Sequence, residues 1–219
     1  MGWNKGDLLM AGKIITVAQQ KGGAGKTTLA AQLGVACAAG GRKVALVDID
    51  PQASLGTWWR ERNGTDAARH SVEVVEVAGY RVGNELTRLK RAFDLVIIDS
   101  PPHAETEARL AVRAADLVLV PVQPSPMDIW ATQPTIELAR SARKPVMVVL
   151  NRVPPRGKVV DQMRTRLTES GVPVAATAIG NRVTFAASML DGAGVVETAA
   201  RSTAADEIRA LGGEILDRL

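Results

Sequence analysis

Two lysines and three glycines stand together between a short apolar run and an Ala-rich stretch. The segment reads Lys21-Gly22-Gly23-Ala24-Gly25-Lys26-Thr27-Thr28, shortly after the apolar residues 14–18. Such glycines let backbone N–H groups turn inward around phosphate oxygens, and a helix that begins near Lys26 aims the positive end of its dipole at the same place. Lys26 can neutralise β- and γ-phosphates, and the Thr27 hydroxyl can bind Mg²⁺. The segment predicts a phosphate-binding loop.

Three carboxylates follow apolar runs that read as buried strands. Asp99 comes after residues 95–98, and Asp48 and Asp50 alternate at the end of residues 44–49. A carboxylate at a buried strand end without a cation would be costly, so Asp99 is expected beside the phosphate loop, where it can hold a water of the Mg²⁺ shell. Asp48 or Asp50 can instead cap the turn over residues 51–54, and this alternative stays open.

The positions of these groups depend on alternating strands and helices. Strands are expected at residues 14–18, 44–49, 95–98, 117–120 and 146–150. Helices are expected at residues 26–39, 82–92, 105–114, 127–142 with a bend or boundary at Pro134, 163–170 and 203–219. Nearly continuous apolar strands between helices predict an α/β fold, a mostly parallel sheet with helices on both faces. All strand C-termini then lie at one edge, which brings the carboxylates to the loop.

Length and composition exclude several classes of protein. The chain has 219 residues, which suits one domain; we expect an extension at residues 1–12 and a single domain at residues 13–219. One cysteine, Cys37, excludes an intrachain disulfide and a Cys-rich zinc site, and two histidines argue against a histidine metal centre. No apolar run is as long as a membrane span and no secretion signal is evident, so we expect a cytoplasmic protein.

The charge is divided unevenly along the chain. Residues 1–139 carry 15 basic and 15 acidic side chains, whereas residues 140–219 carry 12 basic and 8 acidic ones. The formal surplus of +4 therefore lies entirely in the C-terminal third. Such asymmetry can indicate an anionic partner, although four charges also fit an ordinary solvated surface.

Several motifs together resemble the ParA/MinD family of P-loop ATPases. The KGGAGKTT segment with its second lysine, Lys21, resembles the family's deviant Walker A motif. Residues 47–52 resemble its D-x-D-P-Q element, residues 95–102 its Walker B strand with following prolines, and residues 120–130 the P-S-P-x-D-x-W stretch of small ParA proteins. The resemblance is specific over residues 13–155 and looser beyond.

This resemblance implies a role for each matching residue. Lys21 would contact the phosphates of a partner's nucleotide across an ATP-sandwich dimer, Asp50 would orient or activate the attacking water, and Asp48 would support the metal shell. Asn151 and Arg152 follow the last predicted strand without the Asp of a guanine-reading N-K-x-D motif, which favours ATP. By resemblance, Asn151 would bind adenine and Arg152 would line the pocket. The implied cofactors are ATP and Mg²⁺.

The resemblance also implies partners. ParA-type proteins bind DNA without sequence preference as ATP-bound dimers, so we expect a nucleoid-associated homodimer and a ParB-like or cargo-bound protein that stimulates hydrolysis. Candidate DNA contacts include Arg166, Arg209 and Arg218, and the five that we select are Arg156, Lys158, Arg164, Arg182 and Arg201. The cargo can be a plasmid, a chromosome region or a protein assembly.

Two other functions compete with this one. A MinD-like membrane-cycling ATPase needs a basic amphipathic C-terminal helix, whereas residues 206–219 are acidic, interrupted by Gly212-Gly213, and free of Phe and Trp. A metabolic enzyme of the same fold, such as an amidoligase or a nitrogenase-like reductase, is a third class, but the reductase needs cluster cysteines that the chain lacks. Cys37 is expected in the core, whereas Trp58, Trp59 and Trp130 fit either core anchors or a dimer face.

Overall fold

One parallel sheet runs through the computed structural model, which describes residues 11–78, 81–102, 105–155 and 159–219. The strand order is β3-β2-β4-β1-β5-β6, and each neighbouring pair is parallel. The strands are β1 (Lys13–Val17), β2 (Val44–Asp48), β3 (Glu73–Glu76), β4 (Leu95–Asp99), β5 (Leu117–Val122) and β6 (Val146–Leu150). The predicted parallel sheet is confirmed.

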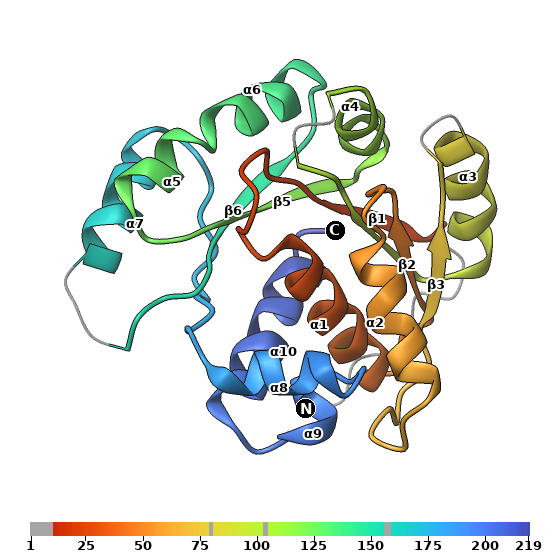
Figure 1. The fold of residues 1–219 in the computed structure, drawn as a ribbon. Coiled ribbons are helices and arrows are strands. Elements are labelled where there is room, and N and C mark those ends of the chain that lie inside the picture. The colour runs from red at the N-terminus through yellow and green to blue at the C-terminus, as the bar shows by residue number, and fades with distance from the viewer. Residues whose placement is uncertain (1–10, 79–80, 103–104, 156–158) are drawn as a thin grey trace.

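Helices cover both faces of this sheet, as strands buried on both sides require (Figure 1). One face packs against α1 (Lys26–Ala39), α2 (Ser54–Asn63), α8 (Val183–Leu190), α9 (Val195–Thr198) and α10 (Thr203–Leu216). The other face packs against α3 (Val82–Ala92), α4 (Glu105–Ala114), α5 (Pro126–Trp130), α6 (Gln133–Ser141) and α7 (Val159–Glu169). Within the described ranges, no helix is both long enough and apolar enough to cross a bilayer.

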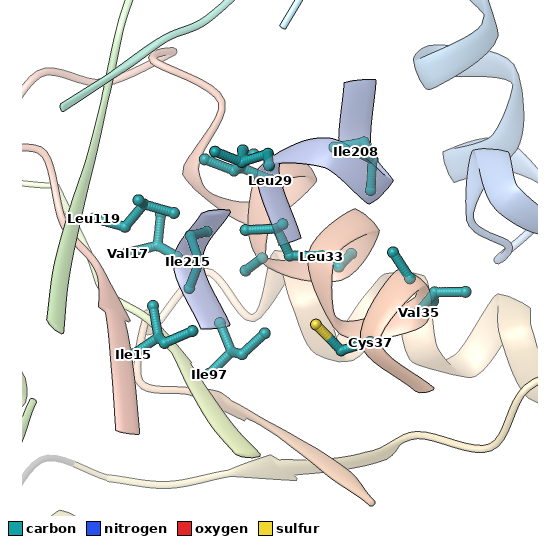
Figure 2. Close-up of a cluster of buried hydrophobic side chains, with 14 of the residues drawn as sticks. Ile15, Val17, Leu29, Leu33, Val35, Cys37, Ile97, Leu119, Ile208 and Ile215 are labelled. Carbon is teal, nitrogen blue, oxygen red and sulfur yellow. The ribbon is translucent and has the colours of Figure 1, made fainter. Parts of the chain in front are cut away.

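The helix after the phosphate loop, α1, is the centre of the larger core. Its Leu29 and Leu33 lie between Ile15 on the sheet and Ile208 on α10 (Figure 2). Small residues such as Ala30 and Ala31 are fully buried on the same helix, which lets its neighbours approach closely. Cys37 belongs to this cluster, and burial raises the pKa of its thiol to about 12. The prediction that Cys37 is a core residue is confirmed.

The register of the central strands brings the predicted carboxylates together. Asp99, the last residue of β4, pairs with Val17 on one side and with Asp48 on the other. The loop that leads to α1 leaves β1 at Val17, at the same edge of the sheet. Asp48, Asp99 and the glycine-rich loop therefore share one sheet edge, as the strand pattern predicted.

The structure adds elements that the sequence pattern did not predict. The strand β3 is a short edge strand of sequence EVVE, and α2, α8 and α9 lie in stretches for which the sequence pattern predicted no element. Of the bend or boundary predicted at Pro134 within residues 127–142, the structure has a boundary: α5 and α6 are separated by residues 131–132, and Pro134 stands in the first turn of α6. Residues 1–10 lie outside the described ranges, so the domain boundary after residue 12 stays a prediction.

Candidate nucleotide-binding site

The glycine-rich loop is shaped to expose backbone N–H groups at the start of α1. Gly23 and Gly25 have φ of 78° and 88°, in the left-handed region that favours glycine. Gly25 is the N-cap of α1, and no side chain caps the helix there. The first N–H groups of α1 therefore lack an intrahelical acceptor, which makes this end of the helix suited to an anion.

Two amide side chains hold the loop from outside. Asn151 donates from Nδ2 to the carbonyl of Ala24 at 2.8 Å, and Gln123 donates from Nε2 to the carbonyl of Gly23 at 3.2 Å. A Cβ at Gly25 would lie 2.6 Å from Asn151 Nδ2, so a larger residue there would displace this clamp. Residues that directly follow β5 and β6 thus hold the loop in place, in addition to its connection to β1.

Lys26 is a buried cation at the base of this loop. Only 7% of the residue is exposed, and it forms none of the ion pairs found among the described residues. Burial lowers the pKa of Lys26, while the nearby carboxylates of Asp99 and Asp50 favour its charged form. A buried ammonium beside free helix N–H groups is an arrangement that a phosphate would complete.

Asp99 and Thr27 meet beside Lys26. The Thr27 hydroxyl donates to Asp99 Oδ2 at 2.6 Å, and Asp99 is 1% exposed. Burial raises the pKa of the Asp99 carboxyl to about 7, and its Oδ1 is buried without a hydrogen-bond partner. An orphaned carboxylate oxygen next to a threonine hydroxyl fits the protein side of a magnesium site, in which phosphates and water supply the other oxygens.

The residues otherwise offer no closed metal cage. Within the described ranges, no group of three or more His, Cys, Asp or Glu side chains could hold a metal ion. Proteins commonly bind Mg²⁺ through one or two side chains together with substrate phosphates. The donor set of Thr27 and Asp99 therefore fits a Mg²⁺ that arrives with a nucleotide.

Asp48 binds the turn that follows β2. Its Oδ1 accepts from the backbone N–H of Asp50 and its Oδ2 from that of Gly56, both at 3.0 Å. The residue is 2% exposed, and burial raises the pKa of its carboxyl despite these hydrogen bonds. This geometry matches the turn-capping alternative, and a role of Asp48 in the metal shell stays a prediction.

Asp50 lies at the open end of the same turn. It is partly buried, and its Oδ1 accepts from the Gln52 N–H at 2.9 Å. Its carboxylate is close enough to Lys26 to favour the charged form of that lysine. Asp50 is therefore brought to the phosphate loop, with a lone pair left for a further donor such as water.

Lys21 is bound within its own chain, by a residue that the sequence analysis did not single out. Its Nζ lies 2.8 Å from Asp128 Oδ1 on α5; the Lys21 side chain is 41% exposed and that of Asp128 is 9% exposed. Ser125, the N-cap of α5, hydrogen-bonds to the other carboxylate oxygen of Asp128. The signal for Asp128 was present in the P-S-P-x-D-x-W stretch, of which it is the only acidic residue.

A cavity of about 890 Å³ opens beside the phosphate loop. Its walls include Gly25 and Thr28 of the loop and α1, Trp58 of α2, and Phe185 and Met189 of α8. Asn151 and Arg152 also line it, as predicted for a base pocket, together with residues 179–182. The Asn151 amide is held by Ala24 and by the N–H of Arg152, so its predicted contact with adenine stays a prediction.

The predicted DNA contacts are dispersed. Arg182 lines the cavity, where its guanidinium forms two hydrogen bonds with Glu207 at 3.0 and 2.5 Å. Arg164 donates to the carbonyls of Ala175 and Ala176. Guanidinium groups held in this way have fewer donors left for DNA. Arg201 is exposed, and Arg156 and Lys158 lie outside the described residues.

Comparison with known proteins identifies the family to which this chain belongs. The family described as the CobQ/CobB/MinD/ParA nucleotide binding domain matches residues 15–195. The chain belongs to this family. The match covers the loop, the strand-end carboxylates and most of the residues that line the cavity.

Relatives and solved structures agree with this assignment. Maintenance of carboxysome distribution protein A of Halothiobacillus neapolitanus is 34% identical over 92% of this chain and 95% of that protein. The chromosome-partitioning ATPase Soj of Thermus thermophilus is 28% identical over 94% of this chain and 96% of that protein. The crystal structure of the cell division ATPase MinD of Pyrococcus furiosus superposes with a TM-score of 0.80 at 22% identity, covering 95% and 100% of the two chains. This likeness confirms the P-loop fold.

Proposed function

We propose that this chain is a ParA-like ATPase that binds ATP with Mg²⁺ and dimerises across the bound nucleotides. The ATP-bound dimer binds DNA without sequence preference, and a partner on the cargo stimulates hydrolysis and release. The observation that carries this proposal is Lys21, a second lysine at the surface of a phosphate loop in a chain of the MinD/ParA family. Its side chain is exposed enough to reach a nucleotide in a second copy.

Each residue of the site has a part in this activity. The N–H groups of residues 22–27 and the ammonium of Lys26 bind the phosphates, and Gln123 and Asn151 keep the loop in place. Mg²⁺, held by Thr27 and Asp99, would neutralise developing charge on the phosphate oxygens. Asp50 orients the attacking water, and Lys21 of the second copy stabilises the transferring phosphoryl group as an arginine finger does.

The cargo favoured by the relatives is a protein assembly. The carboxysome distribution protein of Halothiobacillus neapolitanus spans nearly this whole chain, and its counterpart in Gloeobacter kilaueensis is 38% identical over 74% of the chain. The Soj and ParA relatives have lower identity, from 26% to 32%. We therefore favour a protein cluster over a plasmid or a chromosome region as the cargo.

The packing of α10 argues against the MinD-like alternative. Its apolar residues Ile208, Leu211 and Ile215 are at most 1% exposed and pack against α1 in the core. A helix that inserts its apolar face in a membrane must have that face free. The apolar face of α10 instead stabilises the domain.

A retention assay with and without ATP tests the proposal. The Mg²⁺–ATP form should bind random-sequence DNA, whereas the apo and ADP forms should not, and bound protein should fall steeply as salt rises. Anionic liposomes in parallel test the membrane alternative. Equal retention of all three forms on DNA, or ATP-dependent retention on liposomes alone, would contradict the proposal.

A further inference from the structure

The last long helix, α10, holds a wall of the nucleotide cavity from behind. Residues 179–182, between α7 and α8, line the cavity. Helix α10 carries two glutamates, Glu207 and Glu214, which are seven residues apart and therefore lie on one face of the helix. Glu207 accepts from the backbone N–H of Gly180 at 3.1 Å, and Glu214 accepts from those of residues 176 and 177 at 2.8 and 3.1 Å. The backbone of this segment is thus fixed to α10 at two places.

Glu207 also fixes the one charged side chain of residues 179–182, which is Arg182. Its Nε and Nη2 both donate to the Glu207 carboxylate, at 3.0 and 2.5 Å, so the planar guanidinium is held at two atoms. The guanidinium lies over Gly180, where a Cβ would be 2.8 Å from Arg182 Nε and 3.1 Å from Cζ. Gly180 is not among the described glycines with positive φ. Its backbone therefore does not require glycine, but the position of the Arg182 guanidinium does.

The predicted adenine ligand, Asn151, is occupied by contacts within the chain. Its amide donates to the carbonyl of Ala24 and accepts from the N–H of Arg152. A base that lies in the cavity beside the phosphate loop therefore needs a further group on the cavity wall. The guanidinium of Arg182 suits this role, because a fixed planar cation stacks on aromatic rings and donates to ring nitrogens and carbonyls.

We infer that Arg182 contacts the base of the bound nucleotide and that Glu207 is a positioning residue that holds Arg182 for this contact. The inference rests on the proposed function, in which the phosphate loop binds ATP. A nucleotide with its phosphates at the start of α1 extends into the cavity, whose walls include both Thr28 and Arg182. The Arg182 side chain is 36% exposed and that of Glu207 is 16% exposed, so the guanidinium has the larger surface available to a ligand.

The test compares ADP with inorganic triphosphate, which has phosphates but no base, by equilibrium titration of the full-length chain with Mg²⁺. Arg182→Ala should weaken ADP binding by at least about tenfold, and Glu207→Gln by at least about threefold, because the guanidinium is lost or no longer held. Neither change should alter the affinity for triphosphate, since the phosphate loop is untouched. The double variant should bind ADP as Arg182→Ala does, because Glu207 acts only through Arg182.

Two further variants separate this role from general support of the segment. Glu214→Gln is the matched control: its side chain is 19% exposed and holds the same segment, but residues 176 and 177 are not among the described residues that line the cavity. It should lower the melting temperature as Glu207→Gln does and change ADP affinity by less than about twofold. Gly180→Ala should weaken ADP binding as Glu207→Gln does, because its Cβ displaces the guanidinium.

The outcomes distinguish failure of this inference from failure of the proposed function. A parent that binds ADP and an Arg182→Ala variant that binds it equally well would overturn the inference alone. Equal loss of ADP affinity in Glu207→Gln and Glu214→Gln would also overturn it, because the order of the whole segment would then matter and not the guanidinium. Loss of triphosphate affinity in step with ADP affinity would overturn it as well, since the phosphates and not the base would be affected. A parent that binds neither ADP nor ATP would overturn both.

Discussion

Lys21 and Asp128 form an ion pair of 2.8 Å between the phosphate loop and α5, across 107 residues of sequence. Under the proposed function, the lysine that would contact the nucleotide of a second copy is held by a carboxylate of its own chain. The proposed ATP-bound dimer would have to replace this contact with a better one. The pair acts as a restraint on the monomer, and its strength sets part of the cost of dimerisation.

Removing that restraint should favour the dimer. In Asp128→Asn, Lys21 no longer faces a carboxylate, while the neutral amide keeps a similar shape. Because the Lys21 side chain is 41% exposed, each pair contributes only about 0.5–1 kcal/mol. Both copies release the pair when they dimerise, so ATP-dependent dimerisation should occur at about five- to thirtyfold lower protein concentration. Sedimentation with Mg²⁺–ATP measures this.

Lys21→Ala provides the opposing control for the same experiment. It removes the restraint and also the contact with the second copy, so ATP-driven dimerisation should be lost. Dimerisation of Lys21→Ala at the parent's concentration would show that Lys21 has no role in trans. A weaker dimer in Asp128→Asn would show that Asp128 supports the dimer instead of restraining the monomer.

Substitution of Asp50 should separate binding from hydrolysis. Asp50 accepts one hydrogen bond, from the Gln52 N–H, and lies partly exposed, so Asp50→Ala should fold normally. Loss of a group that orients water should slow hydrolysis by at least about 100-fold and trap the ATP-bound dimer. Single-turnover hydrolysis and ATP affinity measured together check this. Rapid turnover in the variant would exclude Asp50 from the chemistry.

The backbone of the phosphate loop gives a prediction with a matched control. Gly25 and Gly41 have nearly the same φ, 88° and 89°, but only Gly25 is close to another side chain, Asn151. Alanine at either position should cost about 1–2 kcal/mol of stability from the left-handed backbone. Only Gly25→Ala should also lose nucleotide affinity, because its Cβ displaces the clamp on the loop.

Thermal melts and ADP titrations of the two variants distinguish these effects. Gly41→Ala should melt earlier than the parent and bind ADP as tightly. If Gly25→Ala also binds ADP at the parent's affinity, the Asn151 clamp and the loop conformation are dispensable. Equal loss of affinity in both variants would indicate general destabilisation.

Local sequence was enough to predict the phosphate loop and the Asp99 strand end, because glycines, apolar runs and an Ala-rich helix are contiguous signals. It was not enough for contacts between distant segments. Lys21–Asp128 spans 107 residues and Arg62–Glu197 spans 135, and both depend on tertiary packing. The helices α2 and α8 were not predicted. Both begin without a side-chain N-cap, as α1 does, but neither has the Ala-rich composition that marks α1. The hydrogen bond between Arg182 and Glu207 joins residues 25 apart, so local sequence could not show that Arg182 has a partner within the chain.

The buried pair of Arg62 and Glu197 predicts a pH dependence of stability. Both side chains are at most 5% exposed, and Glu197 also accepts backbone N–H groups of Gly194 and His70. Burial alone would raise the pKa of Glu197. Its hydrogen bonds with Arg62 and with the backbone N–H groups of Gly194 and His70 outweigh the effect of burial and hold the pKa below its ordinary 4.5. A lowered pKa stabilises the fold above pH 4.5, and this contribution is lost as pH falls through the folded-state pKa.

Melts of the parent and Glu197→Gln from pH 7 to pH 3 measure this contribution. At pH 7 the variant should be less stable by about 3 kcal/mol or more, because Arg62 is left buried without a carboxylate. The difference between the two should shrink as the pH falls below 4.5 and the parent's carboxyl takes up its proton. A difference that is constant with pH would contradict the lowered pKa.

The salt dependence of DNA binding should show which arginines face the phosphates. Arg201 is exposed, whereas Arg182 is bound to Glu207 in the cavity wall. In a twofold dimer, Arg201→Ala removes two phosphate contacts, so the slope of log affinity against log salt should become shallower by about 1.8. Arg182→Ala should leave that slope unchanged and weaken nucleotide binding instead.

Both variants are measured on random-sequence DNA with Mg²⁺–ATP across a salt series. An unchanged slope in Arg201→Ala would remove Arg201 from the DNA surface, and a shallower one in Arg182→Ala would show that its bond with Glu207 opens when DNA binds.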